Sequence, residues 1–187
     1  MKIKEVLAEL PVLETERLLL RKMGWEDVED IFEYASIPAV AKYTTWEPHQ
    51  SLEDSQRFLK ATIEGYNQHE IACWGIVEKA GNKFIGACGF AEWRPDCARG
   101  EIGYVLSQKY WGNGYMREAV RAMMGFGFLT MQLNRIEGRC MVENTASARV
   151  MEKAGMKFEG VLRQHLFAKG IYHDVKMYSI LRQEWVK

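Results

Sequence analysis

The sequence lacks an excess of either charge. Its 25 lysines and arginines equal its 25 aspartates and glutamates, so the formal net charge is zero. A protein that binds nucleic acid or an acidic membrane usually carries a basic patch, and this chain has no basic stripe. We therefore expect neither nucleic acid nor a membrane as a partner, and any anion site must be local.

Cysteines are few and are not grouped. Cys73, Cys88, Cys97 and Cys140 stand apart, with no C-x-x-C pair and no histidine cluster beside them. Zinc needs closely spaced ligands, so we expect no metal. Three of the four lie in apolar runs, where a free cysteine serves as a small core residue. This usage indicates a reducing, cytoplasmic compartment.

Long apolar runs are absent as well. The N-terminus lacks the apolar core of a signal peptide, and no segment approaches the roughly 20 residues that cross a bilayer. The chain also lacks repeats and obvious linkers. Its 187 residues are enough to bury one self-sufficient core, so we expect a single domain over residues 1–187, with a short extension at 1–12.

Strand and helix patterns alternate along the chain. Runs rich in Val, Ile and aromatic residues predict strands at 17–23, 72–79, 82–93, 100–107, 135–142, 158–168 and 172–182. Helices are predicted at 25–36, 52–67, 113–131 and 145–154. This order mixes hairpins with crossovers. The fold class is therefore α/β, with a mixed α+β sheet of about seven strands and helices on both faces.

Several short signals punctuate these elements. Ser51 with Asp54 is typical of a helix start, and Gly155 suits a left-handed helix end. The pairs Gly81-Asn82 and Lys169-Gly170 predict tight turns. Each of these turns would join two antiparallel strands.

The stretch QKYWGNGYMREA, residues 108–119, places Gly112 and Gly114 at the start of the long predicted helix. The first amides of a helix lack partners and lie at its positive end, so they form an anion site. Glycines there let the backbone wrap a phosphate. Tyr115-Met116 after Gly114 excludes a Walker loop, and the bulk of Arg117 excludes a dinucleotide fingerprint. A plain tight turn fits this stretch equally well.

The surrounding motifs extend the pattern. Tyr-Trp-Gly-x-Gly-Tyr, Glu-Asn-x-x-Ser and Lys-Ala-Gly-x-x-x-Glu-Gly follow one another within residues 99–160. This segment resembles the acetyl-CoA-binding half of the GNAT acetyltransferases, and in particular the Rim-type branch of ribosomal-protein N-terminal acetyltransferases. The likeness runs from LETERLLLR at the first strand to DVKMYSILRQEW at the last.

The resemblance implies acetyl-CoA as cosubstrate. The residues matching the family's diphosphate cradle are Trp111, Gly112, Asn113, Gly114, Tyr115 and Met116. Trp111 replaces the usual Gln or Arg, and Met116 replaces a small residue and could narrow the cradle. The resemblance also implies that the strand at 100–107 parts from its neighbour.

This parting would leave main-chain groups of Tyr104, Val105 and Leu106 to pair with the pantetheine arm. The cations that could meet the 3′-phosphate are Lys109, Arg117 and Arg149. A solvated surface explains any one of these cations equally well.

Acetyl transfer to an amine requires a neutral nucleophile, stabilisation of an oxyanion and a proton for the thiolate. The resemblance places a general base at Glu101, where apolar neighbours would raise the pKa of its carboxyl. An ion pair with Arg99 or Arg139 is the alternative. The resemblance also implies that a backbone amide near Val105 meets the oxyanion.

Two polar residues open the helix at 145–154. Asn144 suits an N-cap, and the resemblance implies that it binds the pantetheine arm. Many family members carry an acidic tyrosine where Met151 stands. Met151 cannot donate a proton, so the role of general acid passes to Ser147, which the resemblance places near the sulfur. The alternative is that Ser147 only supports the start of the helix.

Acids and aromatics gather in residues 42–50 and 90–96. We expect Tyr43, Trp46, Glu47 and Glu92 to bind a cationic acceptor, with Trp93, Asp96 and Asp174 nearby; a solvated loop over the core is the alternative. Freeing an α-amine at pH 7 costs about 1 kcal/mol, against about 4–5 kcal/mol for a lysine-type amine. A modest base therefore suffices for an α-amine.

We accordingly predict acetylation of a protein N-terminus. A small amine such as an antibiotic or polyamine is the second candidate, and a non-catalytic acyl-CoA-binding module the third. Many relatives pair, so a homodimer using the aromatics at 43–46 is a further expectation.

Overall fold

One central sheet organises the chain in the structure, a computed structural model that describes residues 7, 10–69 and 72–185. Its strands are β1 (Leu13–Glu14), β2 (Leu18–Arg21), β3 (Ala72–Glu78), β4 (Lys83–Arg94), β5 (Arg99–Leu106), β6 (Arg135–Met141), β7 (Lys157–Ala168) and β8 (Ile171–Leu181). They lie in the order β1-β2-β3-β4-β5-β6-β8-β7. Among these described strands only β5 and β6 pair in parallel, so the predicted mixed sheet is confirmed. The eighth strand is β1, whose two residues are too short to show a period.

The helices follow the predicted order. They are α2 (Val28–Ala35), α3 (Pro38–Ala41), α4 (Leu52–Asn67), α5 (Tyr115–Leu129) and α6 (Thr145–Ala154), with 3-10 turns η1 (Trp25–Asp27), η2 (Pro95–Cys97), η3 (Gln108–Tyr110) and η4 (Arg182–Glu184). The helices α4 and α6 have the predicted bounds. The helix α5 starts two residues later than predicted because Gly114, its N-cap, has a φ of +80°, which a right-handed helix cannot contain.

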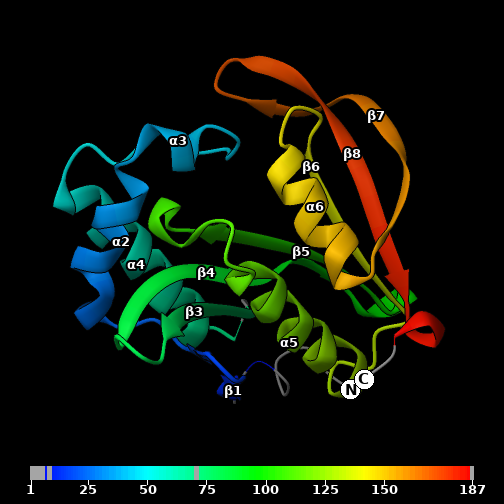
Figure 1. Cartoon of the computed structure of the whole chain (residues 1–187), viewed down its shortest axis with the longest axis horizontal. Coiled ribbons are helices and arrows are strands. Elements are labelled where there is room, and N and C mark those ends of the chain that lie inside the picture. The colour runs from blue at the N-terminus through cyan, green and yellow to red at the C-terminus, as the bar shows by residue number, and fades with distance from the viewer. Residues whose placement is uncertain (1–6, 8–9, 70–71, 186–187) are drawn as a thin grey trace.

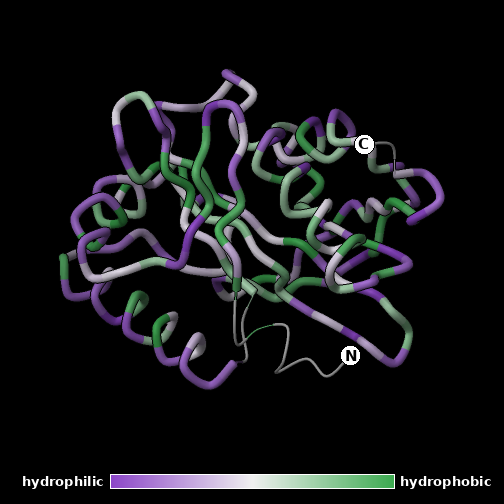
Figure 2. Tube along the Cα trace, turned by 90° about the horizontal axis from the view of Figure 1, so that it is seen from below, coloured by the Kyte–Doolittle hydropathy of each residue, from purple (hydrophilic) through white to green (hydrophobic). Residues whose placement is uncertain are grey.

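Helices cover both faces of the sheet, as predicted (Figure 1). On one face the Trp74 ring of β3 packs edge-on against Phe126 of α5, with ring centres 5.2 Å apart. On the other, the hydroxyl of Tyr66 in α4 donates to the carbonyl of neighbouring Cys73 at 2.8 Å. Apolar stretches run through the strands at the middle of the molecule (Figure 2), and Trp74 there is fully buried.

The predicted turns and caps are present. The carboxylate of Asp54 accepts from the amide of Ser51 at 3.1 Å, and Gly155 ends α6 with a φ of +106°. Lys169 and Gly170 both have positive φ in the turn between β7 and β8. The hairpin β3–β4 is antiparallel. The expected extension at 1–12 falls mainly outside the described residues.

The strands β5 and β6 pair only over their first halves. Pairing runs from Arg99 opposite Arg135 to Ile102 opposite Gly138. Beyond that point β5 continues beside β4 to Leu106, and β6 continues beside β8 to Met141. The expected parting of the strand is therefore present, and one edge of β5 is left without a strand partner from Gly103 onward.

Candidate active site

A run of unpaired amides lies at the start of α5. Among the described residues, the amide N–H groups of residues 112–117 have no acceptor in the protein. Gly112 and Gly114 both have a φ of +80°, a conformation that glycine adopts at little cost. Six consecutive free donors at the positive end of a helix form a site for an anion such as a diphosphate.

The two residues that depart from the family motif do not fill the space in front of the free amides with their side chains. The amide of Trp111 donates to the carbonyl of Gln108 at 3.2 Å, so the free donors begin one residue later than expected. Its indole N–H donates to the carbonyl of Leu106 at 2.8 Å, so that carbonyl already has a partner. The side chain of Met116 is buried in the core; it therefore does not narrow the cradle.

One wall of the opening between β5 and β6 carries a pair of hydroxyl groups. The phenol oxygen of Tyr104 lies 2.8 Å from Oγ of Ser147, and it donates to the Ser147 carbonyl at 3.1 Å. The side chain of Asn144 accepts from the amide of Ser147 at 3.1 Å, so Asn144 caps α6. Burial raises the pKa of Tyr104, which keeps its phenol protonated.

Cys140 lies beside these hydroxyls. Burial raises the pKa of the Cys140 thiol, and both nearby Lys176 and a hydrogen bond with Ser147 oppose that rise. Cys88 is likewise buried, whereas Cys97 is exposed. All four cysteines are free thiols.

The carboxyl of Glu101 lies on the opposite face of β5 from the Tyr104 side chain, because residues three apart in a strand point to opposite faces. It is 9% exposed and pairs with Nε of Arg139 at 3.0 Å. Of the two arginines expected as partners, Arg139 is the one that binds. Burial raises the pKa of Glu101, and the positive charge of Arg139 acts against that rise.

The residues expected to bind the acceptor fall into two groups. Glu92 lies opposite Glu101 on the neighbouring strand. Tyr43, Trp46 and Glu47 follow α3, where Trp46 packs against the core and Glu47 lies 3.9 Å from Lys169 at the β7–β8 turn. Within the described ranges, no hydrogen bond or ion pair joins the two groups. Trp93 is partly buried against the core.

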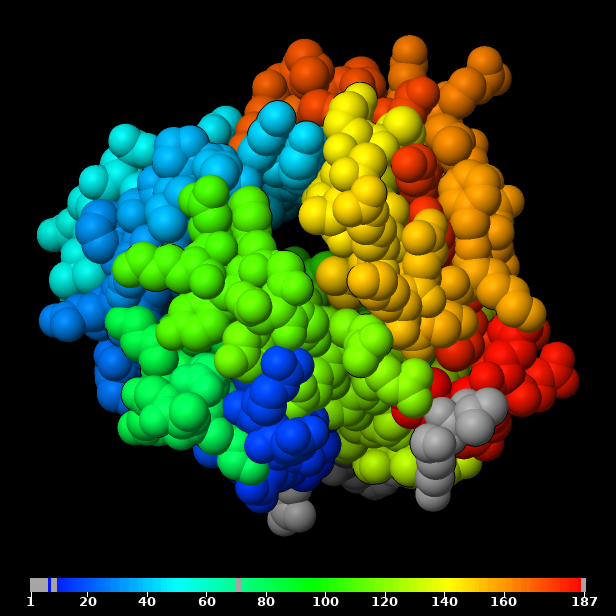
Figure 3. All heavy atoms as spheres, viewed as in Figure 1, coloured from blue at the N-terminus to red at the C-terminus, as the bar shows by residue number. Residues whose placement is uncertain are grey.

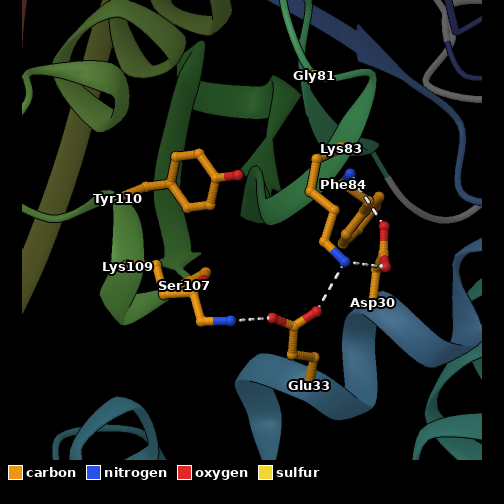
Figure 4. Close-up of a pocket in the computed structure, with 8 residues that line it drawn as sticks. All are labelled: Asp30, Glu33, Gly81, Lys83, Phe84, Ser107, Lys109 and Tyr110. Carbon is orange, nitrogen blue, oxygen red and sulfur yellow. Dashed lines mark hydrogen bonds and ion pairs between the residues drawn. The ribbon is translucent and has the colours of Figure 1, made fainter.

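A separate cavity of about 370 Å³ lies on the far side of the η3 turn, between α2 and the start of β4. Figure 4 shows its charges paired: Glu33 accepts from both Lys83 and Lys109. Lys109 pairs with Glu33 here, but its side chain is 67% exposed. Arg117 and Arg149 are exposed as well, so all three stay candidates for the 3′-phosphate.

The surface is hollowed where these features meet. Figure 3 shows a depression between the start of α6, in yellow, the turn after β5, in green, and the residues around α3, in blue to cyan. The parted strands link the hydroxyls on one face of the sheet to Glu101 on the other. This arrangement can bring a long anionic thioester and an amine together from opposite sides. The described residues contain no group of three or more His, Cys, Asp and Glu that could hold a metal, and no helix among them has the length and hydropathy to cross a membrane.

Comparison with known proteins agrees with this geometry. Residues 17–157 match the acetyltransferase (GNAT) domain family. The uncharacterized N-acetyltransferase p20 of Bacillus licheniformis is 35% identical over 94% of this chain and 99% of its own length. A GNAT-family acetyltransferase from Bacillus anthracis superposes with a TM-score of 0.83 at 32% identity, covering 92% of this chain and 99% of that one.

More distant relatives have named acceptors. The ribosomal-protein-serine acetyltransferase of Escherichia coli is 27% identical over 70% of this chain and 72% of its own length. The spermidine N(1)-acetyltransferase of Vibrio cholerae is 23% identical over 91% of this chain and 96% of its own. RimL, a ribosomal alpha-N-protein acetyltransferase solved in complex with coenzyme A, has a TM-score of 0.80 at 23% identity, covering 91% of this chain and 98% of that one.

The family match spans most of the chain, and the free amides and parted strands suit a nucleotide thioester. The resemblance noted in the sequence is confirmed: this chain belongs to the GNAT family of N-acetyltransferases, with acetyl-CoA as its cosubstrate.

Proposed function

We propose that this enzyme acetylates the α-amine of a protein N-terminus, in the manner of the ribosomal-protein acetyltransferases. The observation that carries this proposal is the pairing of the acids expected around the acceptor. Glu47 lies near Lys169, Glu92 and Asp96 lie beside Arg94, and Glu101 pairs with Arg139. A polyamine, with several positive charges, would compete with these cations for the same carboxylates. A single α-amine, which loses its proton at low cost, needs none of them displaced.

The relatives support both candidates to different degrees. The name of the E. coli relative and that of RimL specify ribosomal protein as acceptor. The spermidine N(1)-acetyltransferase, at 23% identity the same as RimL, supports a small amine as the second candidate. The pairing of the acids favours the protein N-terminus over a polyamine.

In the proposed reaction, the amides of residues 112–117 hold the diphosphate of acetyl-CoA, with Lys109, Arg117 or Arg149 near the 3′-phosphate. Main-chain groups of Tyr104 and Val105 at the unpaired edge of β5 bind the pantetheine arm. Acetyl-CoA supplies the activated acetyl group. Glu101 takes the proton from the acceptor amine, directly or through water. The Ser147 hydroxyl passes a proton to the departing thiolate and regains one from water, so that no charge is left on the serine.

The four free thiols support the proposal that the enzyme works in a reducing, cytoplasmic compartment. Structural disulfides are common in exported proteins and rare in the cytoplasm. None of the four cysteines is needed as a nucleophile, because direct attack by the amine on a thioester requires no covalent enzyme intermediate.

A panel of acceptors tests the proposal. Purified protein is incubated with acetyl-CoA and N-terminal peptides of ribosomal proteins, spermidine or aminoglycosides, while thiol release is measured. We expect turnover with the free N-terminal peptides and none with the same peptides after N-terminal blocking, even where they contain lysine. Turnover confined to spermidine or aminoglycosides would overturn the choice of acceptor.

A further inference from the structure

Arg17 lies just before β2, near the N-terminal end of the described chain, and its side chain contacts the turn at residues 112–117. Its Nη1 donates to the carbonyl of Asn113 at 3.0 Å, and its Nε donates to the carboxylate of Glu118 at 2.7 Å. The guanidinium also lies over the ring of Tyr115, 4.4 Å from its centre. One side chain thus contacts the turn, the first residue of α5 and the first turn of that helix.

The contact with Asn113 fixes the direction of one amide in the run. In a trans peptide unit the C=O and the following N–H point in opposite directions. Because Arg17 holds the Asn113 carbonyl, the N–H of Gly114 is directed away from Arg17. This N–H belongs to the six that have no acceptor among the described residues.

Glu118 creates an electrostatic problem that Arg17 removes. Its carboxylate lies in the first turn of α5, close to where an anion would bind, and would repel a diphosphate. Burial opposes its ionisation, but hydrogen bonds from Thr15 and Arg17 lower the pKa of Glu118. It therefore stays charged, and the Arg17 guanidinium at 2.6 Å supplies the balancing positive charge.

We propose that Arg17 is a positioning residue for cofactor binding: it orients the Asn113–Gly114 peptide and cancels the charge of Glu118, so that the turn at 112–117 accepts the diphosphate of acetyl-CoA. This inference rests on the proposed role of that turn. It assigns a binding function to a residue about a hundred positions away in sequence.

Two ligands separate this role from a purely structural one. Coenzyme A carries the diphosphate, whereas pantetheine keeps only the thiol-bearing arm. Their dissociation constants are measured on the full-length protein, by calorimetry for coenzyme A and by NMR titration for pantetheine. We expect Arg17→Gln to weaken coenzyme A binding roughly tenfold and to change pantetheine binding less than about twofold. Arg17→Lys, which keeps the positive charge, should lose less affinity for coenzyme A than Arg17→Gln.

Two further variants complete the design. Adding Glu118→Gln to Arg17→Gln should restore part of the affinity for coenzyme A, because it removes the unbalanced charge. Arg21→Gln is the matched control: Arg21 is the last residue of β2, the strand that Arg17 precedes, and it pairs with Asp27 at 2.6 Å, away from the turn. It should lower the melting temperature and leave the preference for coenzyme A over pantetheine intact.

The outcomes distinguish the two levels of the proposal. If the natural protein binds coenzyme A no tighter than pantetheine, the role of the turn itself is wrong. If it prefers coenzyme A and Arg17→Gln keeps that preference, the turn stands and the role of Arg17 is wrong. Equal loss of affinity for both ligands, with a lower melting temperature, would also overturn the inference, since it marks a purely structural residue.

Discussion

Two opposing effects act on the carboxyl of Glu101. Burial favours its neutral form, and the nearby carboxylates of Glu92 and Glu137 act in the same direction. Arg139, paired with it at 3.0 Å, favours the charged form. The net result is a raised pKa, so a reaction that uses Glu101 as base should gain rate as the pH rises through that value.

Changing Arg139 should therefore move the acidic limb of the pH–rate profile. Arg139→Gln removes the charge that opposes burial, so the pKa of Glu101 rises further and the limb shifts to higher pH. Arg139→Lys keeps a positive charge and should shift it less. Glu101→Gln should abolish the limb and lower kcat about 10²- to 10³-fold. The measurement is kcat/KM from pH 5 to 8; a limb that stays in place in Arg139→Gln shows that another group titrates.

Sequence reasoning reached the residues of this site unevenly. The family resemblance pointed to Glu101 as a candidate base. The sequence left two possible ion-pair partners for it, Arg99 and Arg139, because the choice depends on the register between strands. Arg17 gave no local signal, since its contacts to Asn113 and Glu118 span 96 and 101 positions. The direction of the Met116 side chain was also out of reach, because it depends on how α5 rotates against the core.

Elements with a capping signal were predicted best. The bounds of α4 and α6 follow from Ser51 with Asp54 at one start and from Asn144 and Gly155 at the ends of the other. The four residues of α3 are too few to show a helical period. The start of α5 was misplaced because the conformation of Gly114, unlike its identity, cannot be read from the sequence.

The start of α6 supports a prediction that separates capping from chemistry. Asn144 accepts from the Ser147 amide, whereas the Ser147 hydroxyl faces Tyr104. Asn144→Ala should therefore cost about 1 kcal/mol of unfolding free energy, and Asn144→Asp should keep most of the cap. Ser147→Ala should lower kcat roughly tenfold to a hundredfold with little change in stability.

Urea unfolding and steady-state kinetics on the same three variants provide the measurement. A Ser147→Ala enzyme with normal kcat would remove the hydroxyl from the mechanism. An unchanged unfolding midpoint in Asn144→Ala would show that the cap contributes little.

At the scale of the whole molecule, the parting of β5 and β6 opens the sheet between its two faces. The sequence predicted a mixed sheet from the order of its elements, and the parting followed only from the family resemblance. Periodicity reports which residues face inward but not where two strands stop pairing. By analogy with paired relatives, the aromatics at 43–46 were expected at a homodimer interface. Tyr43 and Trp46 are half-buried, whereas Phe158, Phe167 and Tyr172 of the β7–β8 hairpin are exposed, and a homodimer stays a prediction.

The last prediction concerns the contact between the β7–β8 turn and the segment at the end of α3. Lys169, at the β7–β8 turn, donates to the carbonyl of Ala41 at 2.7 Å and lies near Glu47. This contact ties the hairpin tip to the segment that borders the hollow in Figure 3. If that segment frames the acceptor entrance, Lys169→Met should raise the KM for the acceptor several-fold and leave the KM for acetyl-CoA unchanged. Lys157→Met, which removes the pair with Glu184 at the other end of the hairpin, is the matched control and should alter neither constant. An equal rise in both constants in Lys169→Met would show that the hairpin tip supports the whole cleft and does not select the acceptor.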